Sequence, residues 1–259
     1  CKYLKMKTEN IDLLIKKVQK KIELLKEHRI GLINQMVTRG LKTNVEMKNS
    51  KINWIGDVPK HWKIERLKYL LKVRNNRSET GEEELLSVTI NSGVVRRRDY
   101  LGNDEEHISR ADTLKGYKIV FKNDLVNNIM KMSFCCLGVS KNDGIVSPGY
   151  SVFEIDQSRL IPTYLHYLLR DPRYVAEYRK RSKGIQESRM RLYDDFFLDI
   201  SIPVPSLTEQ SKIVNQIDNE NTSKLIELEN SKIQELKEYR KSLISSVVTG
   251  KIRVIEVKV

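Results

Sequence analysis

Two segments of the chain place apolar residues at alternating steps of four and three, with many lysines and glutamates between them. One covers residues 9–38 and the other covers residues 220–249. A seam of this period between charged flanks is typical of a long helix in a coiled coil. The seam of the first segment consists of Ile11, Ile15, Val18, Ile22, Leu25, Arg29, Leu32 and Met36. That of the second consists of Ile226, Ile233, Leu236, Arg240, Leu243 and Val247, with Glu229 interrupting the series.

The two segments are copies of one another. Residues 9–29 read ENIDLLIKKVQKKIELLKEHR, and residues 220–240 read ENTSKLIELENSKIQELKEYR. Fourteen of the 30 positions from 9 to 38 recur in the second copy without a gap, which indicates an internal duplication. Each apolar stripe needs a partner, and the simplest partner is the other copy, so we expect an antiparallel coiled coil. Packing of each helix on the intervening domain is the alternative. We expect the seam arginines to extend to solvent or to pair with glutamate.

Between the copies the pattern changes to short β-like runs separated by turn residues. The runs are LLSVTI at 85–90, GYKIVF at 116–121 and YSVFEI at 150–155. Apolar residues after Pro162 predict a helix, and residues 173–181 predict another. The sequence therefore predicts an α+β protein: a mixed α/β globular domain at 50–206, between helical arms at 1–49 and 207–259.

The net charge of the chain narrows the class of molecule that it is expected to bind. The chain has 47 Lys and Arg against 34 Asp and Glu, a net charge of +13, which favours nucleic acid or another polyanion. Three cysteines (Cys1, Cys135 and Cys136) form neither a disulfide framework nor a CxxC pair, which indicates a reducing cytoplasm. No apolar run reaches the ~20 residues of a membrane span, and no secretory signal is visible.

Basic residues of the middle domain gather at two places. Arg96–Arg98 follow a turn that contains Asn91, and Arg179–Arg181 lead into a loop around Gly184. Arginine and glutamine suit base edges, whereas lysine and serine suit phosphates, so we expect these places to contact DNA; a solvated surface loop is the alternative. The predicted DNA-binding residues are Asn91, Arg96, Arg97, Arg98, Lys183, Gln186, Ser188, Arg189 and Arg191, with Lys115 and Lys131 as weaker phosphate contacts.

Signatures of catalysis are missing from the sequence. It contains no GxxxxGK[ST], HExxH, GxSxG or GxGxxG motif, and its four histidines do not stand at metal-pair spacing. We therefore predict a binding protein without catalytic or metal-ligating residues.

Four stretches, in order, resemble the specificity subunits of type I restriction–modification systems. NWIGDVPKHWKIERLKYL (53–70) looks like the opening of a target recognition domain, and DFFLDISIPVPSLTEQSKIVNQID (195–218) looks like its exit into a spacer helix. Between them, NNIMKMSFCCLGVSKNDGIVSPGYSVFEI (127–155) resembles the core segment, and SKGIQESRMRLYDDFFL (182–198) resembles a Gly-centred loop. The resemblance implies a non-catalytic subunit that binds double-stranded DNA and docks methyltransferase subunits, with restriction subunits as further partners. It implies no cofactor for this chain, because S-adenosylmethionine, ATP and Mg²⁺ would belong to the partner subunits.

The chain departs from the family pattern in one respect. The family's usual chain has two recognition domains and two spacer helices, whereas this sequence has one domain between two helices. The resemblance therefore implies either a half-length subunit, expected to form a homodimer through its spacer helices, or a fragment of a full one.

The resembling motifs also have local structural interpretations. Trp54 and Trp62 are expected to form an apolar plug at the domain entry. Ser206 or Thr208 is expected to cap the second spacer helix, and with Ser206 as the cap, Glu209 stands at the capping-box position.

Two other functions are weighed against DNA recognition. The first is a non-catalytic coiled-coil interaction protein whose globular domain binds protein or RNA. The second is an autonomous nuclease or methyltransferase, which the missing motifs disfavour.

Overall fold

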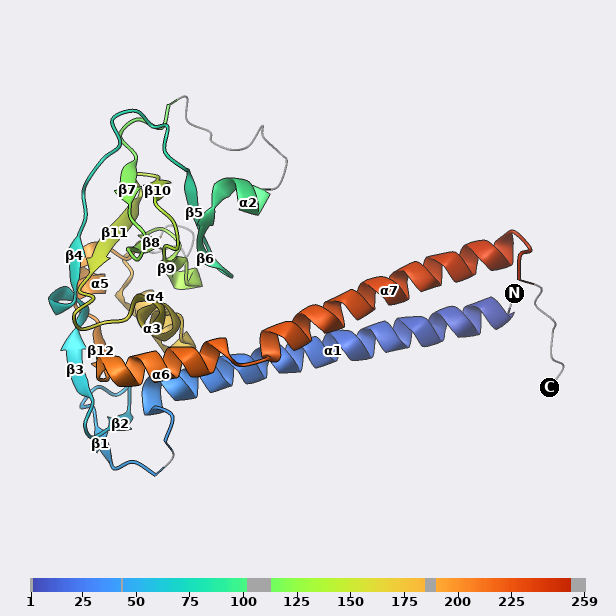
Figure 1. Ribbon diagram of the computed structural model, residues 1–259, viewed down its shortest axis with the longest axis horizontal. Helices are drawn as coiled ribbons and strands as arrows, with labels where there is room; N and C mark the ends of the chain where they lie inside the picture. Colours follow the sequence, from blue (N-terminus) through green and yellow to red (C-terminus); the bar gives the residue numbers. More distant parts are fainter. Residues whose placement is uncertain (1, 43, 102–112, 185–189, 253–259) are drawn as a thin grey trace. The chain divides into compact units, whose positions relative to one another are not determined.

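A computed structural model describes residues 2–42, 44–101, 113–184 and 190–252 (Figure 1). The chain divides into two compact units, residues 1–32 with 218–259 and residues 33–217. The domain boundaries expected from the sequence, after residues 49 and 206, stay a prediction. The described helices are α1 (Lys2–Arg39), α2 (Arg97–Leu101), α3 (Pro162–Leu169), α4 (Pro172–Arg181), α5 (Asp194–Leu198), α6 (Leu207–Asp218) and α7 (Thr222–Val248), with short 3₁₀ turns η1 (Leu67–Tyr69) and η3 (Met132–Phe134).

The described strands are short. They are β1 (Met47–Asn49), β2 (Asp57–Pro59), β3 (Lys63–Arg66), β4 (Leu71–Val73), β5 (Leu86–Thr89), β6 (Gly93–Arg96), β7 (Lys118–Val120), β8 (Leu125–Asn128), β9 (Leu137–Val139), β10 (Gly144–Val146), β11 (Tyr150–Ile155) and β12 (Ser201–Val204). The strands β5, β7 and β11 lie within the three runs that the sequence predicts, and α3 and α4 lie where helices were predicted. The α+β class is confirmed.

The first unit is an antiparallel pair formed by α7 and residues 2–32 of α1. Near the start of α1, Asp12 Oδ1 lies 2.8 Å from Nε of Arg240 near the end of α7. Further along, Lys21 Nζ lies 2.5 Å from Glu229 Oε1. The start of α1 and the end of α7 therefore lie together, as Figure 1 shows. The predicted antiparallel coiled coil is confirmed.

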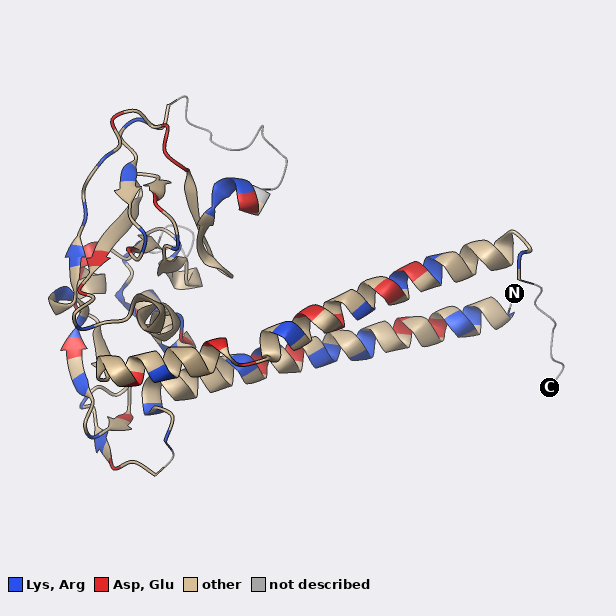
Figure 2. Ribbon diagram, viewed as in Figure 1, with Lys and Arg blue, Asp and Glu red and all other residues tan. Residues whose placement is uncertain are grey.

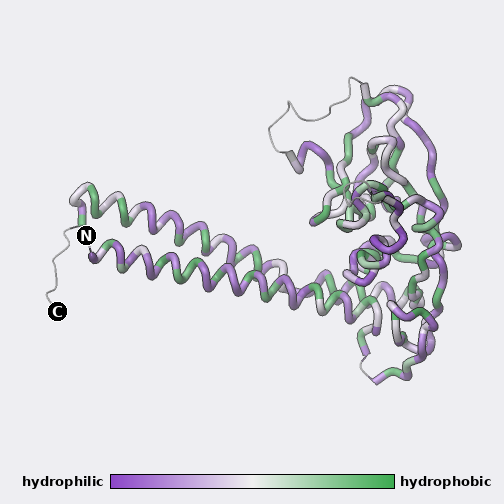
Figure 3. The backbone as a smooth tube through the Cα atoms, turned by 180° about the vertical axis from the view of Figure 1, so that it is seen from behind, coloured by the Kyte–Doolittle hydropathy of each residue, from purple (hydrophilic) through white to green (hydrophobic). Residues whose placement is uncertain are grey.

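Hydrophobic and hydrophilic residues alternate along both helices (Figure 3), and buried seam residues lie at the interface of the pair. At its centre, Val18 and Ile22 pack on Ile233. Glu229 interrupts the seam in the sequence, and it is nevertheless buried there because Lys21 neutralises it. Of the two expectations for the seam arginines, Arg240 meets the first, since its side chain is 39% exposed, and its carboxylate partner in the structure is the aspartate Asp12. Neither long described helix has an apolar stretch that would span a bilayer.

A four-stranded antiparallel sheet of order β4-β11-β8-β9 forms the centre of the second unit. Ser151 pairs with Asn127 and Val152 with Val126, so alternate residues of β11 and β8 share a face. One face carries Val126 and Val152 and packs against apolar residues of the hairpin β5–β6 and of β7 and β10. On the other face Phe153 contacts Phe197 of α5, with ring centroids 5.4 Å apart. The unit is thus layered, with strands covering one side of the central sheet and helices the other.

The entry and exit of the globular fold run alongside each other as strands β3 and β12, which pair in antiparallel register. Trp62 precedes β3 and is fully buried, whereas Trp54 packs edge-on against Tyr174 of α4, with ring centroids 4.7 Å apart. At the start of α6 the Glu209 backbone N–H donates to Ser206 Oγ at 3.3 Å. The reciprocal half of the expected capping box is not made, because the Glu209 carboxylate binds the His61 ring nitrogen at 2.9 Å instead.

Candidate nucleic-acid interface

The hairpin β5–β6 carries Asn91 at an exposed turn. Contacts with β9 and hydrogen bonds from Arg170 hold this turn in place. Gly93 follows the turn with φ of 71°, and a Cβ there would lie 2.9 Å from the His166 ring, so the close approach of the hairpin to β9 requires glycine. Arg170 donates to the carbonyl oxygens of Ile90 and Asn91 and, at 2.7 Å, to that of Leu137. The guanidinium thereby ties the hairpin turn to β9.

The three consecutive arginines after the turn have different hydrogen-bond and ion-pair partners, and Figure 2 marks the Lys and Arg positions of the ribbon in blue. Arg96 Nη2 donates to Asn142 Oδ1 at 3.1 Å, and Arg97 Nη1 lies 3.4 Å from Ser87 Oγ. Arg98 forms a 2.7 Å ion pair with Glu84, although its side chain remains 60% exposed. The expected triplet is therefore not a uniform cationic patch, because one of its charges is balanced within the fold.

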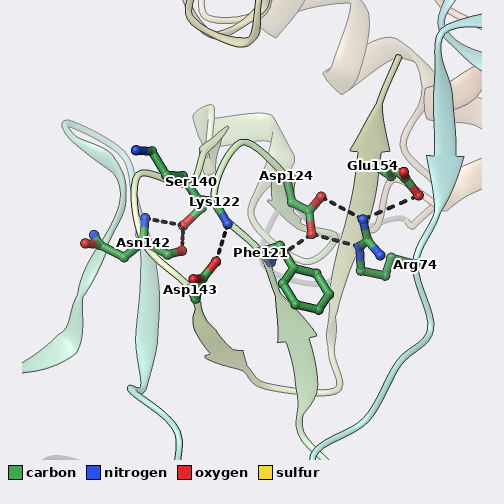
Figure 4. A network of polar contacts seen from close by, with 8 residues as sticks. All are labelled: Arg74, Phe121, Lys122, Asp124, Ser140, Asn142, Asp143 and Glu154. Atoms are coloured by element: carbon green, nitrogen blue, oxygen red, sulfur yellow. Dashed lines mark hydrogen bonds and ion pairs between the residues drawn. The ribbon is translucent and has the colours of Figure 1, made fainter. Parts of the chain in front are cut away.

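Arg96 opens into a polar pocket of about 300 Å³ together with Lys122 and Lys141, and Glu84, Asn142 and Asp143 complete its lining. The turn that carries Lys122 is held by a 2.7 Å hydrogen bond from its backbone N–H to Asp143 Oδ1, and Ser140 Oγ fixes the adjacent turn through the Asn142 carbonyl oxygen at 2.6 Å (Figure 4). Within the part of the chain that the structure describes, the ammonium groups of Lys122 and Lys141 have no ion-pair partner. Sequence reasoning recognised these segments only as turns and missed both lysines.

A second exposed region surrounds the foot of the 182–191 loop. Lys183 and Arg191 exchange two backbone hydrogen bonds, of 2.8 and 2.9 Å, which close the loop. The Lys183 ammonium lies 4.9 Å from the Phe196 ring centroid. The loop residues Gln186, Ser188 and Arg189 lie outside the described residues.

Lys131 lies close to this loop foot, because a backbone hydrogen bond joins its turn to the segment that follows the loop. It is exposed in the turn after β8, and Leu192 donates its backbone N–H to the Ile129 carbonyl oxygen in the same turn at 3.0 Å. The structure thus brings Lys131, Lys183 and Arg191 onto neighbouring segments. Lys115 is exposed in a separate turn before β7.

The arginines of the second sequence cluster serve the fold instead. Arg179 Nε donates to the Ser133 carbonyl oxygen at 3.0 Å, and its guanidinium lies 6.0 Å from the Phe134 ring centroid. Arg181 Nε pairs with Glu177 at 2.6 Å, and its Nη1 lies 3.6 Å from Asp199. The interpretation of Arg179–Arg181 as part of a DNA-facing cluster is therefore corrected for these two arginines, whose charges are used internally.

Burial perturbs the titratable groups between the two exposed regions. It lowers the pKa of Lys118, an effect that the nearby Asp194 carboxylate opposes. It raises the pKa of Tyr150, and the charge of the Arg97 guanidinium opposes that shift. Burial also raises the pKa of the Cys135 thiol to about 11, so the thiol stays protonated at neutral pH. Among the described residues no His, Cys, Asp and Glu side chains gather as a metal site.

Taken together, the structure defines a class of protein: an α+β domain with exposed cationic turns, carried between two paired helices. Comparison with known proteins shows which family of proteins the chain resembles. The chain is 23% identical, over 259 aligned residues, to the type I restriction enzyme MjaVIII specificity subunit of Methanocaldococcus jannaschii. The alignment covers 95% of this chain and 58% of that protein. No protein-family model matches the chain.

Solved structures give the same result for the fold. The HsdS subunit from Thermoanaerobacter tengcongensis has a TM-score of 0.51 at 15% identity, over 94% of this chain and 57% of that one. A chain from a structure that describes complex assembly and conformational transition of a type I restriction–modification system has a TM-score of 0.53 at 13% identity, over 94% and 58% of the two chains. The resemblance to type I specificity subunits that the sequence predicts is therefore confirmed, and this chain spans somewhat more than half the length of the relatives it matches.

Proposed function

We propose that this chain is the part of a type I specificity subunit that reads one half of a bipartite DNA site, without catalytic activity of its own. The observation that carries the proposal is the similarity to such a subunit over 95% of the chain, which includes both helical segments and the domain between them. Two further features support it. The net charge is +13, and the exposed turns carry lysines and arginines that have no ion-pair partner within the described part of the chain.

The pocket of Arg96, Lys122 and Lys141 supports contact with the DNA backbone. Ammonium groups without a carboxylate partner bind phosphate oxygens readily, and neutralising phosphates releases counterions. Each lysine that contacts a phosphate therefore adds affinity of the same size on every DNA sequence. Base discrimination is expected instead from Asn91 and from the loop closed by Lys183 and Arg191.

The helix pair supports docking of a partner protein. Leu14 and Leu225 occupy equivalent positions in the two copies, and both side chains remain exposed, at 49% and 46%. Leu24 and Leu228 add to the apolar surface outside the seam. Leucines repeated in this way on a solvent face favour a protein partner, and we propose methyltransferase subunits in this role, with restriction subunits joining the assembly.

The proposal is tested with fluorescently labelled duplexes. The full chain is first used to enrich a motif from a random duplex library, and binding to the enriched and to a scrambled duplex is then measured across salt concentrations. We expect enrichment of one half-site and a steep fall of affinity with salt. Equal affinity for all duplexes, or preference for RNA, would instead favour the interaction-protein alternative.

Substitutions assign the two kinds of contact. Lys122→Gln and Lys141→Gln should weaken binding to both duplexes equally and reduce the salt slope by about 1 each. Lys16→Gln on α1 is the matched control and should change neither. Charge reversal at Arg189 should reduce binding to the enriched duplex more than to the scrambled one; equal loss on both would make Arg189 a phosphate contact only.

The second recognition domain is proposed to come from a second copy, joined through the helices. Light scattering across a concentration series measures this directly. A dimer mass would support a symmetric, palindromic target. A monomer mass at all concentrations would assign the second domain to a longer chain of the kind found in the relatives.

A further inference from the structure

A second pocket, of about 330 Å³, lies beside the foot of the 182–191 loop. We call it the α5 pocket; Lys118, Ile129, the segment 148–151 and residues 193–195 line it. Ile129 accepts the hydrogen bond from Leu192 that anchors the loop, so the pocket and the loop share a wall. The pocket therefore belongs to the surface that the proposed function assigns to base reading.

Most polar groups on the floor of the α5 pocket already have partners. Ser151 Oγ donates to Asp194 Oδ1 at 2.5 Å, and Lys118 Nζ donates to the Tyr150 carbonyl oxygen at 2.7 Å. These bonds fix the orientation of Asp194 and hold the lysine against β11. They leave the floor rigid before any ligand arrives.

Asp195 is the exception among the carboxylates of the pocket. Its side chain is exposed and, within the described residues, makes no hydrogen bond or ion pair. The exposed ring of Tyr193 lies on the same wall of the pocket. The α5 pocket thus offers a free carboxylate beside an aromatic surface, directly next to the cationic foot formed by Lys183 and Arg191.

A free carboxylate at a DNA-facing surface has a restricted choice of partner. It repels phosphates, and it repels the acceptor atoms that guanine and thymine present in the major groove. The base-edge donors available there are the exocyclic amines, N6 of adenine and N4 of cytosine. A carboxylate accepts a hydrogen bond from such an amine and cannot accept one from a keto oxygen.

We propose that Asp195 is a specificity-determining residue that accepts a hydrogen bond from the exocyclic amine of an adenine or a cytosine, with the ring of Tyr193 contacting the same nucleotide. The inference rests on the proposed function. Asp194 acts as a positioning residue, because its bond to Ser151 fixes the start of α5 and therefore the direction of the neighbouring carboxylate.

Parallel motif selection tests the proposal. The wild-type chain, Asp195→Ala and Asp57→Ala each enrich a motif from the same random duplex library. Asp57 is an exposed carboxylate on β2, so its substitution makes the same change of charge elsewhere in the unit. We expect Asp195→Ala, which removes the acceptor, to lose at least about fivefold discrimination at a single base pair, with equal or tighter binding to scrambled DNA, whereas Asp57→Ala keeps the wild-type motif.

The outcomes separate the inference from the proposed function. A clear wild-type motif that Asp195→Ala reproduces unchanged would overturn the role of Asp195 and leave DNA recognition intact. A uniform loss of affinity on all duplexes would also overturn it, because that is the signature of a structural role. Failure of the wild-type chain to enrich any duplex would remove the proposed function, and the inference with it.

Base analogues identify the amine itself. At the base pair in question, purine replaces adenine, or 2-pyrimidinone replaces cytosine, which deletes the exocyclic amine alone. We expect the wild-type chain to lose at least about fivefold in affinity, and Asp195→Ala to lose little. Equal losses in the two proteins would show that the carboxylate and the amine are not in contact.

Discussion

The two units of the molecule place their ion pairs in different environments. In the helix pair, the ion pairs of Lys21 with Glu229 and of Asp12 with Arg240 lie along a narrow seam and reach solvent on one side. In the globular unit, Asp124 is only 3% exposed and accepts hydrogen bonds from Arg74 and from the Phe121 backbone N–H (Figure 4). Burial raises the pKa of the Asp124 carboxyl even though these donors oppose the shift. In the first unit an ion pair therefore adjusts how the two helices pair, whereas in the second unit an ion pair is part of the core.

The largest expected effect comes from breaking the core of the globular unit. Phe153→Ala removes a fully buried ring that packs on Phe197 and should cost about 3–5 kcal/mol of unfolding free energy. Both tryptophans of the chain, Trp54 and Trp62, lie in this unit, so denaturant titration followed by tryptophan fluorescence reports it selectively. Tyr100→Ala, an aromatic truncation at a side chain that is 64% exposed, is the control and should change the midpoint little.

The buried ion pair should give the next largest effect. Asp124→Ala leaves Arg74 without its main partner in a site where that side chain is only 19% exposed, which should cost about 3 kcal/mol. The measurement is again fluorescence-detected unfolding. The double substitution Arg74→Met with Asp124→Leu should recover most of the loss, because it removes both charges together. A double variant as unstable as Asp124→Ala would show that packing, and not the stranded charge, is responsible.

His166 makes the stability of the globular unit depend on pH. Burial lowers its pKa to about 4, and its Nδ1 accepts a hydrogen bond from the Val139 backbone N–H at 3.2 Å, which requires the neutral ring. The unfolded chain binds the proton near pH 6.5, so this contribution is present above pH 6.5 and is lost as pH falls toward 4. The loss amounts to at most about 3 kcal/mol.

The His166 prediction is checked by unfolding free energies measured at pH 7, 6, 5 and 4.5. His166→Gln keeps an acceptor and does not titrate, so its stability should fall less steeply over this range. Slopes that are identical in the two proteins would contradict the assignment of the proton to this residue.

The sequence predicts the two units with unequal success, and the reason is physical. A pair of long helices is determined by the local spacing of apolar residues. The stripe from Ile11 to Met36 therefore predicts a helix and also its need for a second helix with a matching stripe. In the globular unit the runs at β5, β7 and β11 are recognisable, whereas the face that each strand buries depends on register with strands far along the chain. Pairing of Ser151 with Asn127 is such a long-range fact.

The candidate interface shows the same limit residue by residue. Net charge and the arginine triplet predict a polyanion partner, but a basic residue does not carry its partner in the sequence. Arg98 is neutralised by Glu84, which lies close only in the folded chain, whereas the partner of Arg181, Glu177, stands four residues earlier on the same helix. Lys122 and Lys141 were missed for the converse reason, since each is a single lysine in a turn until the fold brings both to Arg96.

The smallest expected effect tests the comparison of the two units most directly, because it comes from replacing a charged residue in the seam of the helix pair by an apolar one. The cluster at the centre of the helix pair contains Ile15, Val18 and Ile22 of one copy, but only Ile226 and Ile233 of the other, since Glu229 stands where the first copy has Val18. Glu229→Val should complete the cluster and stabilise the helix pair by up to about 1 kcal/mol, as apolar burial replaces a solvent-screened ion pair.

Circular dichroism at 222 nm during thermal unfolding, compared with tryptophan fluorescence, measures this effect, and only the helical signal should shift. The duplication supplies the control. In an antiparallel pair of copies, Val18 faces the position of Lys232 as Glu229 faces Lys21, so Val18→Glu combined with Glu229→Val moves the ion pair to the equivalent place in the other half. The double variant should match the wild-type stability within about 0.5 kcal/mol. A double variant much less stable than wild type would show that the two halves of the seam are not equivalent, and that Glu229 stands where it does because only Lys21 can neutralise it.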